Sequence, residues 1–443
     1  MNAFGDLQAM FQAALKRVDP YRMLVDHVRL EADTLVVAFD GHHHAVDLTD
    51  FDEIVVLGAG KASARMARAI EDILGPRLSG GVVVTKYGHA EKLDRVQVVE
   101  SGHPTPDANS VAGAIKVADL AASAQSRTLV LNLISGGGSA LCCAPVPPLT
   151  LADKQAVTRA LLASGADIGE INCLRKHLST LKGGRLLRLL APAKSLNLIL
   201  SDVVGDDLAT IASGMTTADP TTFTDARGII DKYRLRDQIP ATALDVLMTG
   251  ANETLKPGDP ALDFATNILI GTNLAAVLAA METARDRGYH TVALTASITG
   301  EAREMAKMLF GIARDVRRSG LLVAKPALVI AGGETTVTLA GSGKGGRNQE
   351  MALAFLAELA KDPEGGRGIS FLSASTDGSD GPTDAAGAFA SAEVLGMARA
   401  AGLSINAYLA NNDSYHFFEK TGHLLKTGPT MTNVCDLHMV VVA

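Results

Sequence analysis

The chain has 443 residues, of which 47% are hydrophobic and 20% are charged, and its formal net charge is −7. This composition is typical of a globular enzyme and excludes a disordered or coiled-coil chain. The negative charge, without a run of lysines and arginines, argues against nucleic acid or an anionic membrane as a partner.

The length predicts two domains, because a single hydrophobic core seldom grows to this size. We place their junction near residue 235, which gives an N-terminal domain of residues 1–235 and a C-terminal domain of residues 236–443. The four cysteines lack C-x-x-C spacing, so neither a zinc knuckle nor a disulfide framework is indicated. No apolar run could span a membrane and no signal-peptide pattern opens the chain, so we expect a cytoplasmic protein.

Residues 53–70 predict a buried strand, a glycine turn and a helix. The turn, Gly58-Ala-Gly-Lys61, resembles two nucleotide-binding patterns without matching either. Ser63 stands where the dinucleotide pattern G-x-G-x-x-G needs its third glycine. In the P-loop pattern a hydroxyl residue follows the lysine, and here Ala62 does. Because open α/β sheets bind ligands at the carboxyl ends of their strands, we predict a functional role for Lys61.

A second glycine turn follows the apolar strand predicted at residues 128–134. It reads Ser135-Gly-Gly-Gly-Ser139 and leads into a helix, where backbone N–H groups favour an anion. Leu141 stands where the nucleophile elbow of serine hydrolases needs glycine, which counts against Ser139 as a nucleophile.

Two clusters of aspartates also follow predicted strands. Asp202, Asp206 and Asp207 come after residues 195–201, and Asp377 and Asp380 come after residues 369–374. Carboxylates in such places suit a Mg²⁺ ion or the acceptance of a proton. The sequence leaves open which aspartate would do which.

The most glycine-rich stretch is residues 341–350, Gly-Ser-Gly-Lys-Gly-Gly-Arg-Asn-Gln-Glu, just before a predicted helix. Glycine packs poorly but lets backbone N–H groups approach a ligand closely. Helix N-termini favour anions, and Lys344 and Arg347 add positive charge. We therefore predict a phosphate-binding loop here.

Taken together, these motifs resemble the class II glycerate 2-kinases, a family with a C-terminal MOFRL domain that was formerly labelled hydroxypyruvate reductase. The resemblance covers essentially the whole chain. It implies an α/β fold of two domains: a Rossmann-like N-terminal one with a mainly parallel sheet and a smaller MOFRL-type C-terminal one, with the site in the cleft between them. It also implies ATP-dependent phosphorylation of D-glycerate at its 2-hydroxyl, giving 2-phosphoglycerate and ADP. We expect a monomer or a homodimer.

Phosphoryl transfer needs positioning and positive charge around the transferred group. We expect Lys61 and Arg347, neither of them a packed core residue, to act in catalysis together with Asp206 and Asp377. Mg²⁺ would be held by Asp207 and Asp380. Residues expected to bind glycerate or ATP are Gly58, Gly60, Ser135, Gly136, Gly137, Gly138, Ser139, Lys344, Gly345, Gly346, Asn348 and Glu350. Which cation binds the glycerate carboxylate stays open, although an arginine matches its geometry better.

The main alternative is an NAD(P)H-dependent hydroxypyruvate reductase. It would need a dinucleotide fingerprint, and the missing third glycine at Ser63 counts against it.

Overall fold

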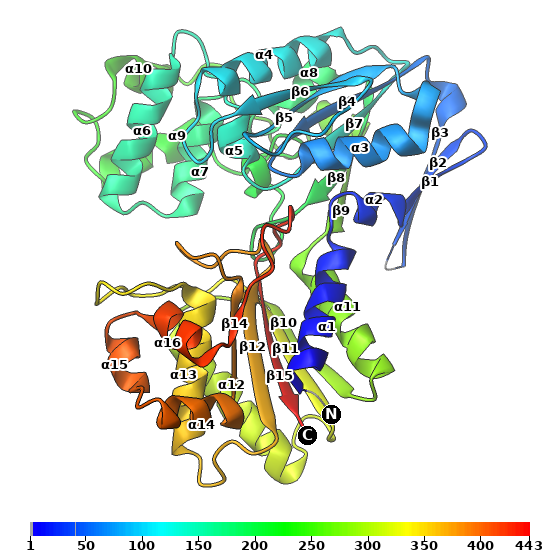
Figure 1. Ribbon diagram of the computed structural model, residues 1–443. Helices are drawn as coiled ribbons and strands as arrows, with labels where there is room; N and C mark the ends of the chain where they lie inside the picture. The colour runs from blue at the N-terminus through cyan, green and yellow to red at the C-terminus, as the bar shows by residue number, and fades with distance from the viewer. Residues whose placement is uncertain (1–2, 40) are drawn as a thin grey trace. The chain divides into compact units, whose positions relative to one another are not determined.

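The computed structural model describes residues 3–39 and 41–443, and its chain passes twice between two α/β units (Figure 1). The inserted unit comprises residues 20–270, and the terminal unit comprises residues 1–19 and 271–443. The expectation of two α/β domains is therefore confirmed.

The inserted unit is built on a six-stranded sheet. The adjacent pairs from the first strand to the fifth are all parallel. Strand β7 is buried along its whole length, as expected for a parallel strand covered on both faces. In spatial order the strands are β6 (Val96–Ser101), β5 (Gly80–Lys86), β4 (Glu53–Ala59), β7 (Thr128–Ile134), β8 (Lys194–Leu200) and β9 (Ala265–Gly271).

Helices cover both faces of this sheet, with α3 and α4 on opposite sides (Figure 1). A separate group, α6, α7, α9 and α10, surrounds its own apolar core. Helices α4, α6, α7 and α9 each begin with a capping box, in which an Asp or Thr side chain accepts a backbone N–H. The helices are α2 (Arg22–Val25), α3 (Ser63–Leu74), α4 (Ala108–Ser123), α5 (Gly138–Leu141), α6 (Leu151–Ser164), α7 (Ile168–His177), α8 (Arg185–Leu190), α9 (Phe223–Lys232) and α10 (Ala241–Thr249).

A small antiparallel sheet completes the inserted unit. It contains β1 (Val28–Glu31), β2 (Thr34–Phe39) and β3 (His42–Asp47).

The terminal unit contains a mixed six-stranded sheet. Strands β10 and β11 are parallel and the remaining neighbours are antiparallel. The C-terminal strand β15 lies in the middle of this sheet, between β11 and β12. In spatial order the strands are β10 (His290–Ile298), β11 (Ala327–Gly333), β15 (Asp436–Val442), β12 (Ile369–Ser375), β13 (Gly387–Ser391) and β14 (Leu424–Leu425).

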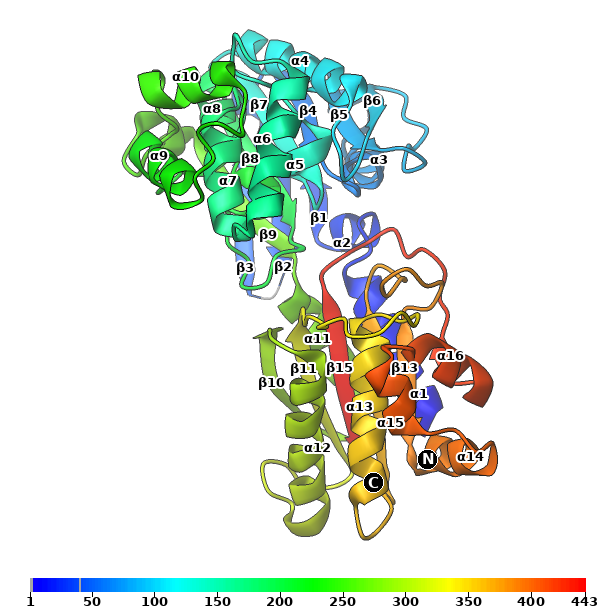
Figure 2. The ribbon, with the colours of Figure 1, turned by 90° about the vertical axis from the view of Figure 1, so that its left-hand side faces the viewer.

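Helices α1 and α11 pack together on one face of this sheet, and α12 and α13 pack together on the other (Figures 1 and 2). The helices are α1 (Ala3–Arg17), α11 (Asn273–Asp286), α12 (Ala302–Ser319), α13 (Arg347–Lys361), α14 (Ala392–Ala400), α15 (Ile405–Ala410) and α16 (Ser414–Thr421).

The unit boundaries differ from the junction predicted near residue 235. Leu235 is buried in the apolar core formed by α6, α7, α9 and α10, so the chain there is still inside the inserted unit. Helix α1 belongs to the terminal unit because it packs on α11, and Asp6 accepts hydrogen bonds from Arg287 and Tyr289. These partners lie far from Asp6 in the sequence, which explains why local composition did not reveal them.

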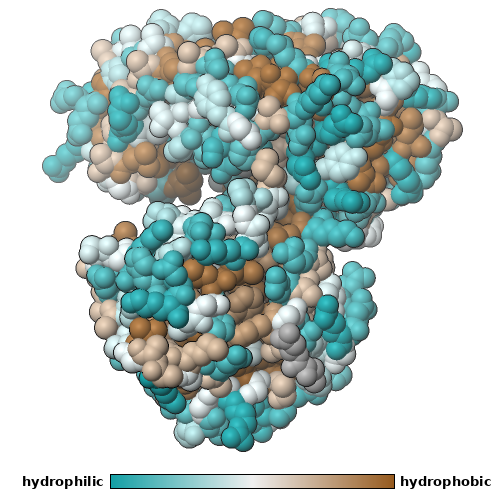
Figure 3. All heavy atoms as spheres, viewed as in Figure 1, coloured by the Kyte–Doolittle hydropathy of each residue, from teal (hydrophilic) through white to brown (hydrophobic). Residues whose placement is uncertain are grey.

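The surface seen in Figure 3 mixes hydrophilic residues with smaller apolar patches. Among residues 3–39 and 41–443, no helix is both long enough and apolar enough to cross a membrane.

A buried ion pair in the inserted unit gives a stability prediction. Lys176 Nζ lies 2.9 Å from Asp219 Oδ1, and both side chains are buried. Replacing Lys176 with methionine leaves the Asp219 carboxylate buried without its cation, so we expect a loss of about 3–5 kcal/mol in urea denaturation. The matched control is Lys232→Met, which removes an exposed ion pair with Glu170 and should change stability little. Equal effects of the two substitutions would contradict the prediction.

Candidate functional site

Lys61 lies in the turn between β4 and α3, as the sequence predicts. The glycine beside it, however, faces protein. A Cβ at Gly60 would lie only 2.1 Å from Ser135 Oγ, and the same Oγ accepts the N–H of Ala62 at 3.0 Å. The space opened by Gly60 is therefore filled by Ser135, a residue that we expected to bind ligand. At Gly58, a Cβ would collide with Val83 and the Leu133 carbonyl.

The second glycine turn lies between Lys61 and Asp202. A Cβ at Gly136 would lie 1.9 Å from Asp202 Oδ2, so a side chain at this position would displace the carboxylate. A Cβ at Gly137 would lie 3.1 Å from His103 Nε2 and 3.2 Å from Lys61 Cε. The turn therefore brings together Lys61, His103 and Asp202 from three different strand ends. At Gly138, a Cβ would touch the Ala59 carbonyl, so this glycine also faces protein.

The environment shifts the protonation of two of these groups. Burial raises the pKa of Asp202, and the nearby Lys61 opposes the rise. Burial, followed by the positive charge of Lys61, lowers the pKa of His103 to about 4, so its ring is neutral at pH 7. A carboxylate whose pKa is raised is a better proton acceptor near neutral pH.

A pocket of about 590 Å³ opens beside this turn and is lined by His103, Gly137, Ser139 and Asp202. Ser139 Oγ lies 2.7 Å from Ser213 Oγ, and the Ser213 hydroxyl donates to Asn172 Oδ1. This chain of hydrogen bonds fixes Ser139 in the pocket wall. Four cationic side chains from α6, α7 and the segment before α8 also line the pocket, and together we call them its cationic wall: Lys154, Arg159, Arg175 and Lys182.

Of the three aspartates after β8, the structure places Asp202 in the pocket wall. Asp207 is exposed and caps a turn, accepting the N–H of Ala209 and the hydroxyl of Thr210. Burial raises the pKa of Asp206, whose backbone is left-handed at φ 56. Neither Asp206 nor Asp207 is among the residues that line the pocket, so Asp202 replaces them as the candidate acid in this unit.

In the terminal unit, the predicted phosphate loop is followed by α13 as expected. Most N–H groups of the loop, however, donate hydrogen bonds to other residues of the protein. Asn412 Oδ1 accepts from Gly341, and Asp413 Oδ1 accepts from Lys344. Asn411 accepts hydrogen bonds from the backbone N–H groups of the two loop residues between Gly341 and Lys344. Further along, Gly345 packs against Ser414 and Gly346 against Asp380, while Lys344 Nζ lies 4.3 Å above the Tyr415 ring.

Arg347 is held by carboxylates. Its Nη2 donates to Asp436 Oδ1 at 2.9 Å, its Nε donates to Oδ2, and its Nη1 lies 3.1 Å from Glu334. Burial works to lower the pKa of Arg347, but the bond to Asp436 together with the negative charges of Asp436 and Glu334 outweighs it and the pKa is raised. Because Asp436 is fully buried, removing Arg347 would leave a carboxylate without its partner. The expectation that Arg347 carries no packing role is corrected.

Asp380, a predicted metal ligand, caps α13. Its two oxygens accept four N–H bonds, from the backbone and side chains of Asn348 and Gln349. Two bonds to each oxygen use the acceptor capacity of the carboxylate, so the geometry does not support metal binding by Asp380. Burial raises its pKa to about 6. Asp377 Oδ1 accepts from the hydroxyl of Ser375 and from the N–H of Ser379.

Two other predicted binding residues lie inside the terminal unit. Asn348 is fully buried and its Oδ1 accepts the hydroxyl of Ser373. Glu350 is buried and paired with Arg303 and Asn412. Both therefore hold α13 in place.

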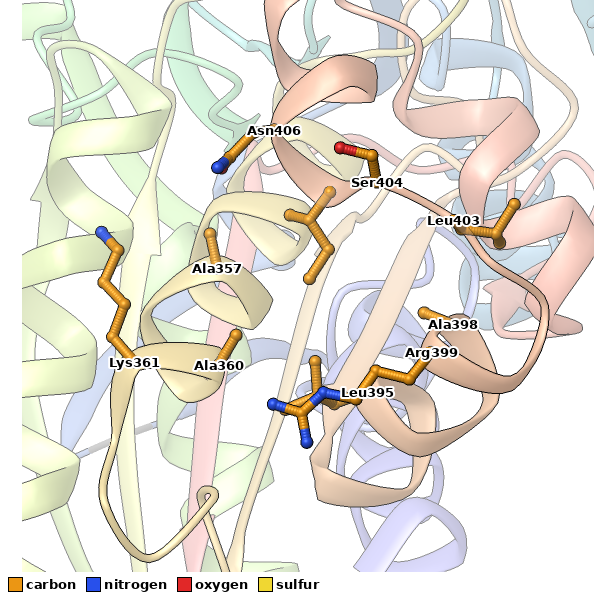
Figure 4. A pocket seen from close by; sticks show the side chains of 10 residues that line it. Ala357, Ala360, Lys361, Leu395, Ala398, Arg399, Leu403, Ser404 and Asn406 are labelled. Atoms are coloured by element: carbon orange, nitrogen blue, oxygen red, sulfur yellow. The ribbon is translucent and has the colours of Figure 1, made fainter.

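A shallow groove of about 220 Å³ also lies in the terminal unit, between α13, α14 and α15 (Figure 4). Half of its lining is alanine and leucine, with Lys361 and Arg399 as the charged residues. No acid or glycine turn lines it, and the hydroxyl of Ser404 caps α15 by accepting the N–H of Ala407, so we place no chemistry there.

Mg²⁺ is held in phosphoryl-transfer sites by one or two carboxylates together with substrate phosphates. The described residues contain no cluster of three or more His, Cys, Asp or Glu side chains that could hold a metal alone. Asp202, beside Lys61 and the glycine turn, fits the one-carboxylate arrangement.

No pattern in the sequence predicts a role for His103, Lys154 or Arg175, and Asp202 is one of three aspartates after its strand that the sequence does not distinguish. For Asp202 a signal was present, since it follows β8, the neighbour of β7 in the sheet.

Comparison with known proteins places the chain in a family. Residues 6–248 match a domain of unknown function (DUF4147), and residues 327–436 match the MOFRL family. A protein of Agrobacterium vitis that bears the provisional name hydroxypyruvate reductase is 45% identical over 390 residues, covering 88% of this chain and 87% of its own length. The glycerate 2-kinase of Pyrococcus horikoshii is 38% identical over 434 residues, covering 97% of this chain and 95% of its own length.

The fold agrees with a solved structure. The crystal structure of glycerate kinase from Thermotoga maritima aligns with a TM-score of 0.88 at 36% identity, covering 100% of both chains. The chain, which joins a DUF4147 domain to a MOFRL domain, therefore belongs to the glycerate kinase family.

Proposed function

We propose that this protein is an ATP-dependent kinase that phosphorylates the 2-hydroxyl of D-glycerate to give 2-phosphoglycerate and ADP. Relatives that carry the name glycerate 2-kinase support this activity. The structural observation that carries the proposal is the meeting of Lys61 and Asp202 on either side of one glycine turn. A cation and a proton acceptor at one place are what phosphoryl transfer to an alcohol requires.

In this proposal Lys61 stabilises the negative charge that spreads over the transferred phosphoryl oxygens. Asp202 receives the proton of the attacking hydroxyl or holds Mg²⁺ together with ATP oxygens. When bound, Mg²⁺ neutralises the phosphate charge. His103, neutral at pH 7, and Ser139 orient the substrates by hydrogen bonding.

The name of the Agrobacterium relative favours a second candidate, a reductase. In dinucleotide-binding folds the second glycine lets the backbone approach a pyrophosphate. Here Ser135 occupies the space beside Gly60, and Ser63 donates to the Leu133 carbonyl at 2.8 Å. The turn is closed by protein, which counts against a dinucleotide in this place.

Two assays on the purified full chain separate these activities. We expect ADP formation with D-glycerate, ATP and Mg²⁺, and no oxidation of NADH with hydroxypyruvate. Excess EDTA should abolish the kinase reaction and Mg²⁺ should restore it, because the charge of ATP must be neutralised during transfer. Full turnover in excess chelator, or NADH oxidation without kinase activity, would overturn the proposal.

A further inference from the structure

The cationic wall of the pocket contains a lysine without a partner. Lys154 on α6 lines the pocket, its exposed fraction is 6%, and its Nζ has no hydrogen-bond partner among the described residues. An ammonium group buried without a partner is costly. The neighbouring Lys182 differs, because its Nζ donates to the Cys142 carbonyl at 2.7 Å.

The positive charges around Lys154 favour the binding of an anion. Arg175 and Lys182 line the same wall, and Arg159 lies one turn further along α6. The one carboxylate in the lining is Asp202, beside the glycine turn. A ligand that brings negative charge to this wall would give Lys154 the partner that the protein does not supply.

The size and rim of the pocket indicate which anion it takes. A volume of about 590 Å³ is far larger than a three-carbon acid needs and falls within the usual range for pockets that hold drug-sized ligands. Leu162 and Ile168, exposed by 60% and 59%, line the pocket beside the cationic wall. Apolar surface next to clustered cations matches a molecule with a flat ring at one end and phosphates at the other.

We propose that this pocket is the nucleotide site, in which Lys154 and Arg175 bind phosphate oxygens and Leu162 and Ile168 contact the base. The identity of the ligand as ATP rests on the proposed function, but the binding itself can be tested without catalysis. The arrangement directs the phosphate chain toward the second glycine turn, which lies between Lys61 and Asp202.

The first test measures binding of three probes to the full chain by calorimetry: ADP, inorganic triphosphate and D-glycerate. Lys154→Met should lower the affinity for ADP and for triphosphate by about 10-fold to 100-fold, the effect of losing one charged hydrogen bond. The affinity for D-glycerate should stay unchanged. Leu162→Asn should lower the affinity for ADP by about fivefold and leave the affinity for triphosphate unchanged. The controls are Lys116→Met and Ile115→Asn, which alter exposed residues of α4 outside the pocket lining.

A second measurement separates a binding role from a structural one. Methionine fills the volume of Lys154 without its buried charge, so Lys154→Met should melt at the same or a higher temperature than the natural protein. A melting temperature well below it, with ADP affinity unchanged, would show a structural role and overturn the proposal.

Proton exchange gives an independent readout. The pKa of Lys154 is lowered to about 7, mainly by burial and to a smaller extent by the positive charges of Lys182, Arg175 and Arg185, while Cys143 acts in the opposite direction. A bound phosphate would raise this pKa again, so ADP binding at pH 8 should take up a proton that Lys154→Met does not. Equal proton uptake in both proteins would contradict a contact between Lys154 and the phosphates.

The remaining outcomes are also decisive. If Lys154→Met weakens D-glycerate but not ADP, the pocket holds the acid substrate and the proposal is wrong. If ADP binding depends on Lys154 while no glycerate is phosphorylated, the nucleotide site stands and the proposed function fails. If Lys154→Met does not fold, Arg175→Gln takes its place, with the same losses expected for ADP and triphosphate.

Discussion

Replacing Lys61 with alanine should lower kcat for glycerate phosphorylation by about 10²–10³ or more, the range for losing one preorganised electrostatic contact to a transition state. Lys61 is half-buried in the turn between β4 and α3, its side chain lies near Gly137, and its backbone carbonyl, which the substitution keeps, accepts a bond from Thr85. Thermal stability should therefore change little. Steady-state kinetics with saturating ATP and glycerate measure the loss.

The control for this experiment is Lys116→Ala, which removes an exposed lysine of α4 and should leave turnover unchanged. Near-normal turnover of Lys61→Ala would make Lys61 an ordinary surface charge and would remove the catalytic role proposed for it.

The second large effect is expected for Asp202→Asn, which keeps the shape of the side chain but removes its ability to accept a proton. We expect kcat to fall by about 10²–10⁴, the usual contribution of general acid–base catalysis. If Asp202 instead holds Mg²⁺, the variant should need much more Mg²⁺ for half-maximal rate, so the rate is measured across a Mg²⁺ series.

Asp206→Asn and Asp207→Asn are the comparison variants, because both aspartates follow the same strand but do not line the pocket. Their turnover should stay near normal. Loss of turnover in either one, with Asp202→Asn active, would restore the assignment that the sequence alone favours.

Local patterns were sufficient to predict the strands, turns and helices around Lys61, Ser139 and Arg347, because each is encoded within about fifteen residues. They were not sufficient to show what the glycines approach. Gly60 makes room for Ser135, and Gly346 makes room for Asp380, whereas the sequence predicts that both glycines bind glycerate or ATP. A glycine pattern reports close approach of the backbone, and the approaching group can be protein as easily as ligand.

Asp202 can be identified as the acid at the site only when the spatial order of the strands is known. Asp202 lies above Gly136 because β7 and β8 are neighbours, and strand order is not local information. The pairing of Arg347 with Asp436, 89 residues away, is hidden for the same reason. Nothing in the sequence predicts that Lys154 is buried beside a pocket, since a lysine on a helix is ordinarily exposed. The shared cleft between the two domains stays a prediction.

The assignment of α1 to the terminal unit has a consequence for biosynthesis. This helix is translated before the inserted unit, but α11 and the strands on which it packs are made only after that unit. Domains generally fold as units during synthesis, so residues 20–270 can acquire structure while the apolar face of α1 is still without its partners. The terminal unit completes its sheet only when β15, which follows the other strands of this sheet in the chain, enters between β11 and β12.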